Sequence, residues 1–180
     1  VFDVLGKAGS DQVQLAKFPE LKVITHLHTA ANSPAMCDAA AVLMIGSSDF
    51  AERQGLRPLA RIVDTVTCCA EPLEVVSGCV EDTKTILERN RLLPDDVDVF
   101  EIHEAFAATI VKLQRELAID AERLNVNGGC IALGHPMGAT GAIMAGTALD
   151  ELKRAEGRLA LVAASGAGGT GSALLLERCD

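Results

Sequence analysis

The chain has 180 residues, with 25 Asp and Glu against 16 Lys and Arg, so its formal net charge at pH 7 is −9. This balance argues against nucleic acid and anionic membranes as partners, and no apolar run approaches the length of a membrane span. Hydrophobic residues make up 49% of the chain and aromatic residues only 3%, with no Trp or Tyr. A core of Ala, Val, Leu and Ile is typical of close-packed helix and parallel-sheet layers, and the length fits one domain.

The six cysteines do not indicate a structural zinc site, because none of them forms a C-x-x-C pair. We therefore expect no bound metal. Free, mostly buried thiols are typical of a reducing compartment, so the cysteine usage predicts a cytoplasmic location.

The first 22 residues show no strong hydrophobic period, apart from a short helix predicted for 11–18. We assign 1–22 as the remnant of a loop region or linker and 23–180 as the domain. The stretch 23–29 predicts a strand, in which His26 and His28 alternate. Their period-two spacing would suit a metal on one face, but no third ligand is evident.

The next segment predicts a helix over 33–45. Ser33 is a good N-cap residue and Pro34 suits the first helical position. The apolar run 39–45 would supply the buried face of this helix, and Gly46 would end it.

From there to the end of the chain, strands alternate with helices, which predicts a layered α/β domain. Strands are predicted at 59–68, 97–102, 158–164 and 172–177, and helices at 48–55, 79–93, 105–117 and 138–153.

The glycine-dense stretch from Asn125 to Gly141 carries the most specific chemical signal. His135 lies in it directly before Pro136, and the residue before a proline is excluded from the helical region. An imidazole held on such a turn at the start of a helix is either a catalytic group or a packed histidine on a connecting loop. These residues alone leave both interpretations open.

Two further stretches carry polar groups at the ends of predicted strands. Ile102-His-Glu-Ala-Phe-Ala107 forms a strand-to-helix corner, and Ser165-Gly-Ala-Gly-Gly-Thr-Gly171 separates the last two strands. Taken alone, Glu104 would be a helix-start charge that the helix dipole favours, and His103 a surface polar group.

Together the three stretches resemble the thiolases, the acyl-CoA acyltransferases that make or cleave 3-ketoacyl-CoA. The histidine signature of that family is filled at Asn125, Gly128, Gly129, Gly134, His135, Pro136, Thr140 and Gly141. The His-Glu-Ala-Phe form is similar to that of thiolases from trifunctional β-oxidation complexes. The resemblance runs from about residue 23 to 177 and covers only the C-terminal half of a thiolase. It implies a layered thiolase-type domain, with a mixed five-stranded sheet and helices on both faces.

The resemblance also implies roles for individual residues. His135 would activate the nucleophile and donate in an oxyanion hole, while His103 would hold a water, or itself supply the hydrogen bond, in that hole. Glu104 would orient its neighbours. The residues implied to contact the substrate are Ser33, Phe106, Gly134 and Ala167.

Two departures from the family bear on activity. The family has a proton-shuttling cysteine where this chain has Ser165, and a hydroxyl is a far weaker acid than a thiol. Pro34 stands where the family has a small hydroxyl residue. In addition, the nucleophilic cysteine of thiolases belongs to the N-terminal half, and none of the six cysteines here lies in its motif.

The main hypothesis is therefore the C-terminal half of a thiolase-type acyl-CoA C-acyltransferase that takes its nucleophile from an N-terminal half, in the same or a separate chain. Its substrate would be a coenzyme A thioester, without a cofactor, and it would form a homo-oligomer. The alternative is a degenerate, non-catalytic thiolase-like subunit that binds acyl-CoA or stabilises an assembly. A third hypothesis, a glycine-loop domain for a phosphate-bearing ligand, is weaker because the glycine loops contain no Lys or Arg.

Overall fold

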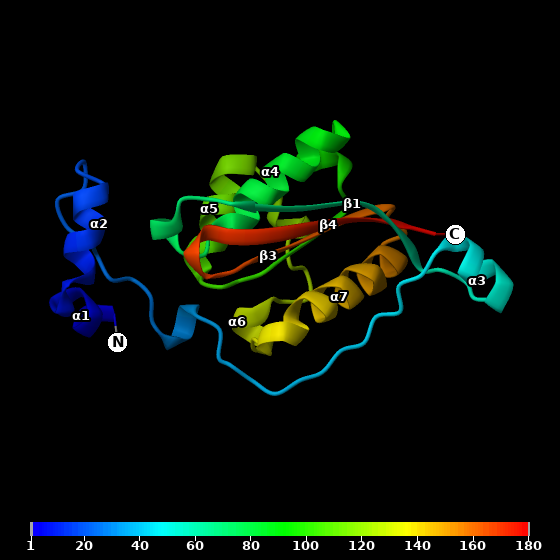
Figure 1. The fold of residues 1–180 in the computed structure, drawn as a ribbon, viewed down its shortest axis with the longest axis horizontal. Coiled ribbons are helices and arrows are strands. Elements are labelled where there is room, and N and C mark those ends of the chain that lie inside the picture. Colours follow the sequence, from blue (N-terminus) through cyan, green and yellow to red (C-terminus); the bar gives the residue numbers. More distant parts are fainter. Residues whose placement is uncertain (1, 180) are drawn as a thin grey trace.

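A four-stranded mixed sheet lies between two layers of helices in the computed structural model, which describes residues 2–179 (Figure 1). The strands are β1 (Ala60–Cys69), β2 (Val99–Ile102), β3 (Leu159–Ser165) and β4 (Thr170–Arg178). Their order is β1-β4-β3-β2, with β4 antiparallel to both neighbours and β2 parallel to β3. The predicted α/β architecture with a mixed sheet is confirmed.

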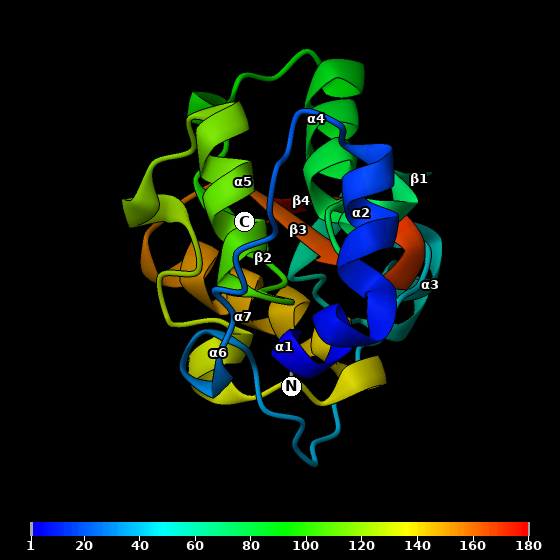
Figure 2. The same cartoon turned by 90° about the vertical axis from the view of Figure 1, so that its left-hand side faces the viewer.

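Helices α4 (Gly78–Asn90) and α5 (Ala107–Leu117) cover one face of the sheet (Figure 2). The larger hydrophobic core lies beneath them, and Ile86, Phe100 and Leu113 are fully buried there. Both helices were predicted, at 79–93 and 105–117, and the first was predicted from its apolar spacing, because one apolar stripe must face this core.

Helix α7 (Thr140–Arg154), with the single turn α6 (Cys130–Leu133) before it, covers the opposite face. A second core of Ala148, Leu152 and Ala160 fills the space between α7 and the sheet. Helices therefore lie on both faces, as predicted. No helix in the described part of the chain is long and apolar enough to cross a membrane.

Three short helices belong to the N-terminal third of the chain, and the first two lie to one side of the sheet (Figure 1). They are α1 (Phe2–Leu5), α2 (Asp11–Lys17) and α3 (Ser48–Gln54), with a π-helical turn at Gly6–Ser10. The His26 imidazole joins α1 to α2, because its Nδ1 lies 2.7 Å from Asp3 and its Nε2 3.0 Å from Asp11. His28 instead packs beside Phe106, with ring centroids 4.7 Å apart, so the two histidines do not share a metal set.

The strand predicted for 23–29 is wrong, and the sheet has four strands rather than five. An extended segment becomes a strand only where a neighbour accepts and donates its backbone hydrogen bonds. Within residues 2–179 no strand lies beside this segment.

The helix predicted for 33–45 is also wrong. Thr29 caps only a 3₁₀ turn, Ala30–Asn32. Residues 33–47 then continue without helix as an extended segment, the strap, that passes along α7 (Figure 1). The apolar run 39–45, predicted to be buried, is exposed throughout. A short continuous apolar run has no period that separates helix from strand, which explains the error.

The N-terminus of α4 approaches the start of β4 so closely that only glycine fits at its first position. A Cβ on Gly78 would lie 2.3 Å from the carbonyl oxygen of Thr170. Gly146, in the middle of α7, has no atom within 4 Å of the corresponding position.

We predict opposite effects for alanine at these two glycines. Gly78→Ala should lower the free energy of unfolding by about 1–3 kcal/mol, because backbone must move to admit the methyl group. Gly146→Ala should raise it by about 0.5–1 kcal/mol through the helix preference of alanine. Urea denaturation of both variants measures this, and equal effects would contradict the close approach.

A carboxyl group is buried in the edge strand β2. Glu101 is only 3% exposed and its Oε1 has no hydrogen-bond partner among the described residues. Burial is the main cause that raises the pKa of Glu101 to about 7, and the nearby negative charges of Glu104 and Glu151 add to the rise. The folded chain therefore holds a proton here that the unfolded chain releases near pH 4.5.

We predict that Glu101→Gln stabilises the fold above pH 7 and has little effect near pH 4.5. A raised carboxyl pKa contributes stability that is present at low pH and lost as pH rises through the folded value. The shift from 4.5 to about 7 corresponds to about 3 kcal/mol at most, at 1.36 kcal/mol per pKa unit. Denaturation of both proteins across this range measures the difference, and an equal difference at pH 5 and pH 8 would contradict the prediction.

Candidate active site

His103 directly follows β2 and continues its parallel pairing with β3. Its backbone N–H donates to the Ala163 carbonyl at 2.8 Å, and its Nδ1 lies 3.2 Å from the Ser165 carbonyl oxygen. Because a carbonyl only accepts, Nδ1 carries the ring proton and Nε2 keeps its lone pair. That Nε2 is buried, and no described residue hydrogen-bonds to it.

His135 lies between α6 and α7 and is held on three sides. Its N–H donates to the Ala35 carbonyl at 2.8 Å, and its own carbonyl accepts the N–H of Cys37 at 3.4 Å. Its Nδ1 lies 2.8 Å from the Thr140 hydroxyl, at the first residue of α7. The strap and the start of α7 therefore fix the direction of the imidazole.

The two imidazoles lie side by side, with ring centroids 4.4 Å apart and the rings inclined by 36°. Burial lowers the pKa of His135, and burial together with the neighbouring charge of His135 lowers the pKa of His103. Both rings are therefore neutral near pH 7, and each can accept a proton or a hydrogen bond.

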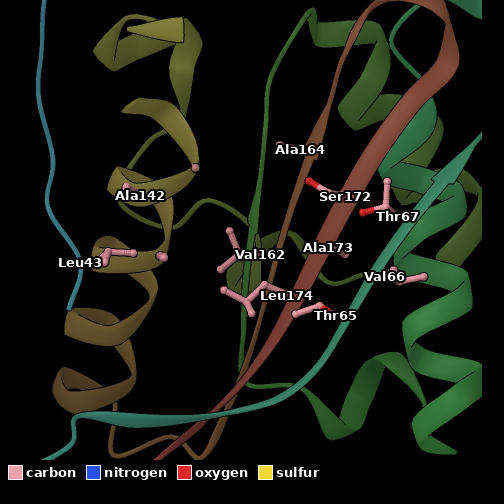
Figure 3. Close-up of a pocket in the computed structure, with 12 residues that line it drawn as sticks. Leu43, Thr65, Val66, Thr67, Ala142, Val162, Ala164, Ser172, Ala173 and Leu174 are labelled. Atoms are coloured by element: carbon pink, nitrogen blue, oxygen red, sulfur yellow. The ribbon is translucent and has the colours of Figure 1, made fainter. Parts of the chain in front are cut away.

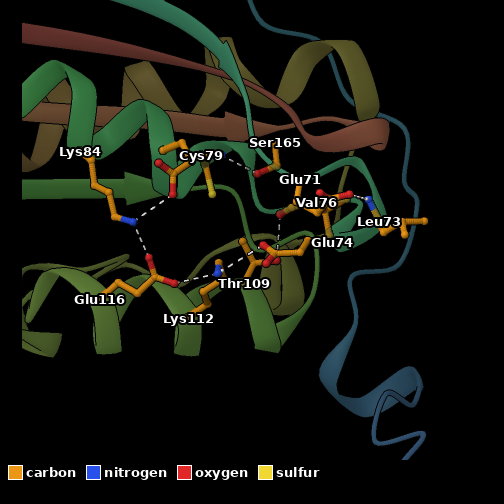
Figure 4. Close-up of polar contacts among 11 residues, drawn as sticks. Glu71, Leu73, Glu74, Val76, Cys79, Lys84, Thr109, Lys112, Glu116 and Ser165 are labelled. Atoms are coloured by element: carbon orange, nitrogen blue, oxygen red, sulfur yellow. Dashed lines mark hydrogen bonds and ion pairs between the residues drawn. The ribbon is translucent and has the colours of Figure 1, made fainter. Parts of the chain in front are cut away.

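Ser165 is the last residue of β3 and faces two neighbours. Its carbonyl oxygen contacts His103, while its Oγ accepts the N–H of Cys79 at 2.9 Å, in the first turn of α4 (Figure 4). Burial raises the pKa of the Cys79 thiol to about 11. The Ser165 hydroxyl is thus held at a helix N-terminus, and the thiol beside it is protonated at neutral pH.

Glu104 joins the corner after β2 to the glycine-dense stretch. One carboxylate oxygen accepts the N–H of Ile131 at 2.8 Å, and the other accepts from the Asn125 amide at 3.1 Å. A Cβ on Gly129 would lie 2.2 Å from the Glu104 carboxyl carbon, so glycine leaves room for the carboxylate. These contacts are the geometry that an orienting role for Glu104 requires.

The predicted substrate-contacting residues are more dispersed. Phe106 lines a cavity of about 530 Å³ together with His28 and Lys112, but neither His103 nor His135 lines it. The Ser33 hydroxyl is buried and has no hydrogen-bond partner among the residues that the structure describes. Gly134 adopts φ +96° against the Cys37 sulfur, and Ala167 is exposed on the β3–β4 turn. The structure therefore gathers His103, Glu104, His135 and Ser165, and leaves Ser33 and Ala167 without a hydrogen bond to either imidazole.

Cys130 was not among the predicted site residues, yet it lies with the two histidines. One ligand atom from each of His103, Cys130 and His135 falls within 4.8 Å of the others, and the described residues contain no second such group. The sequence signal was only that Cys130 precedes His135 by five positions in one loop. Its proximity to His103 depends on the fold.

Comparison with known proteins places this geometry in context. The family model "Thiolase, C-terminal domain" matches residues 56–178. Beta-ketothiolase BktB from Cupriavidus necator is 44% identical over 150 residues, and the beta-ketoadipyl-CoA thiolase from Escherichia coli is 46% identical over 152. Each alignment covers 83% of this chain and 38% of the relative.

A solved structure agrees in fold. The Bacillus anthracis acetyl-CoA acetyltransferase superposes with a TM-score of 0.81 at 37% identity, over 84% of this chain and 38% of that chain. The chain thus spans well under half the length of the relatives it matches. By the family model and by these relatives, the chain belongs to the thiolase family and corresponds to its C-terminal domain.

Proposed function

We propose that the chain is the C-terminal half of an acyl-CoA C-acyltransferase that cleaves 3-ketoacyl-CoA by thiolysis or forms it by Claisen condensation. The observation that carries this proposal is the convergence of three turns, which bring His103 beside both the His135 ring and the Ser165 carbonyl oxygen. The relatives described above, two thiolases and an acetyl-CoA acetyltransferase, support the reaction class.

The protonation states suggest how the two imidazoles would act. In the tautomer of neutral His135 whose Nδ1–H donates to the Thr140 hydroxyl, Nε2 keeps its lone pair and would take the proton of a cysteine thiol, which produces the attacking thiolate. Nε2 of His103 carries a lone pair rather than an N–H, so it would accept a hydrogen bond from a water molecule. That water would donate its other hydrogen to the thioester oxygen as negative charge develops there.

An N-terminal thiolase half would supply the nucleophile and cover two apolar surfaces. Residues 39–45 of the strap are extended and exposed, with Val42 93% and Met44 79% accessible. No strand of residues 2–179 pairs with them. Between α7 and the sheet, Leu43 lines a mainly apolar cavity of about 360 Å³ (Figure 3). Exposed apolar surface and an unpaired extended segment are typical of an interface that lacks its partner.

A second candidate is a non-catalytic thiolase-like subunit that binds acyl-CoA or stabilises an assembly. The Ser165 hydroxyl favours it, because this group is a weak acid and is already engaged with the Cys79 N–H. Homo-oligomerisation and a cytoplasmic location remain predictions under either proposal.

We predict that Ser165→Cys raises thiolysis of acetoacetyl-CoA by about 10²-fold or more, because a positioned acid/base group contributes on that order. The assay uses the chain assembled with an N-terminal thiolase half. Ser165→Ala is the matched control, since it removes the hydroxyl without adding a thiol. Equal activity of the wild type and Ser165→Cys would refute our account of Ser165, and CoA binding without turnover in both would favour the non-catalytic subunit.

We further predict that the acid limb of the kcat/KM profile lies below pH 6.5. His135 must be neutral to accept a proton, and its lowered pKa keeps it neutral to lower pH than an exposed histidine. The profile is measured on whichever assembly of the previous experiment is active. A limb centred above pH 6.5 would mean that another group, or a protonated His135, controls the reaction.

A further inference from the structure

His103, Cys130 and His135 form a compact set of metal-ligand atoms, and two of the three are almost fully buried. One ligand atom of each lies within 4.8 Å of the other two. His103 and Cys130 are 5% and 6% exposed, whereas His135 is half-buried and so remains partly accessible to solvent. Imidazole nitrogen and cysteine sulfur are the donors that zinc and similar thiophilic cations prefer.

The outer contacts of these residues match those of metal ligands. The Nδ1 atoms of His103 and His135 are bound to the Ser165 carbonyl and the Thr140 hydroxyl, which orients the rings and leaves Nε2 for a ligand. His103 Nε2 is a buried polar atom with no hydrogen-bond partner among residues 2–179, a state that proteins rarely leave uncompensated. Burial raises the pKa of the Cys130 thiol, and the backbone N–H of Glu104, which hydrogen-bonds to the sulfur, offsets part of that rise.

We propose that His103, Cys130 and His135 bind Zn²⁺ or a similar thiophilic divalent cation, with the fourth position open to water. Zn–N bonds of about 2.0–2.1 Å and a Zn–S bond of about 2.3 Å place tetrahedral donors roughly 3.3–3.6 Å apart. The three donors must therefore close by about 1 Å, which side-chain rotation supplies. Binding replaces the Cys130 thiol proton, which passes to solvent, so affinity rises with pH.

The metal would compete with acyl transfer, a consequence that rests on the proposed function. The Nε2 atoms that would accept the nucleophile's proton and hold the oxyanion water are the atoms that ligate the metal. Zinc would therefore act as a reversible inhibitor, and removal of the metal would restore activity.

Cobalt titration of the full 180-residue chain, without an affinity tag, tests the site directly. We expect one Co²⁺ per chain, a sulfur-to-cobalt charge-transfer band in the near ultraviolet and the visible bands of tetrahedral cobalt. Cys130→Ala should abolish the charge-transfer band, and His103→Asn should weaken Co²⁺ binding at least about tenfold, as changes near metal ligands do. Zn²⁺ should displace the cobalt.

The matched control is Cys37→Ala, because the Cys37 sulfur is exposed and lies against Gly134, next to His135 in sequence. This variant should keep the charge-transfer band. Absence of the band in the wild type, its survival in Cys130→Ala or its loss in Cys37→Ala would each overturn the assignment. Thermal melts without metal check folding, and Cys130→Ser, which keeps the side-chain volume, replaces Cys130→Ala if that variant unfolds.

A second measurement separates this inference from the proposed function. Zn²⁺ inhibition of thiolysis is expressed relative to each variant's own metal-free rate, and Cys130→Ala should need at least about tenfold more Zn²⁺ for half-inhibition. Cobalt binding without thiolysis in any assembly would remove the acyltransferase proposal and keep the metal site. Thiolysis without stoichiometric cobalt binding would remove the metal site and keep the acyltransferase.

Discussion

The parallel pairing of β2 with β3 is the constraint on which the candidate active site depends. The backbone pairing continues one residue past β2, because the His103 N–H donates to the Ala163 carbonyl. This bond positions the His103 imidazole beside the Ser165 carbonyl oxygen. Since β2 is an edge strand, the side of its backbone that faces away from β3 has no neighbouring strand within residues 2–179 to hydrogen-bond with. The Asn125 side chain closes this side by bonding both the N–H and the carbonyl of Ile102, at 2.8 and 2.9 Å.

The second half of the site is attached to this edge by one carboxylate. Glu104 accepts hydrogen bonds from Asn125 and Ile131, so its carboxylate joins the corner after β2 directly to the glycine-dense stretch. Gly129 admits the carboxylate, and at φ +96° Gly134 gives the turn that presents His135. The pair of imidazoles is therefore a product of backbone pairing and close packing, with no direct hydrogen bond needed between the rings.

Desolvation gives the site its chemical character. It keeps His103 and His135 neutral, holds the Cys79 thiol protonated and raises the pKa of Glu101 to about 7. A region of neutral donors and acceptors suits a charge that develops only during the reaction. The buried His103 Nε2 has no hydrogen-bond partner in the described part of the chain, and that atom is the common element of the acyl-transfer and metal-binding proposals.

Local pattern was sufficient for the helices and strands that pack on their own sheet, and the predicted helices 79–93 and 105–117 are α4 and α5. The apolar spacing of 79–93 was informative because it records which side of the helix faces the core. The ordered motif around His135 likewise indicated the family. The strand predicted at 23–29 is wrong because no strand of residues 2–179 pairs with it. The helix predicted at 33–45 is wrong because Ala35 and Cys37 hydrogen-bond to the His135 backbone instead, and the rest of the run is extended and exposed. Only the tertiary structure brought Cys130 to His103 and the Ser165 hydroxyl to the Cys79 N–H, because contacts between residues far apart in the chain leave no periodic signal in it.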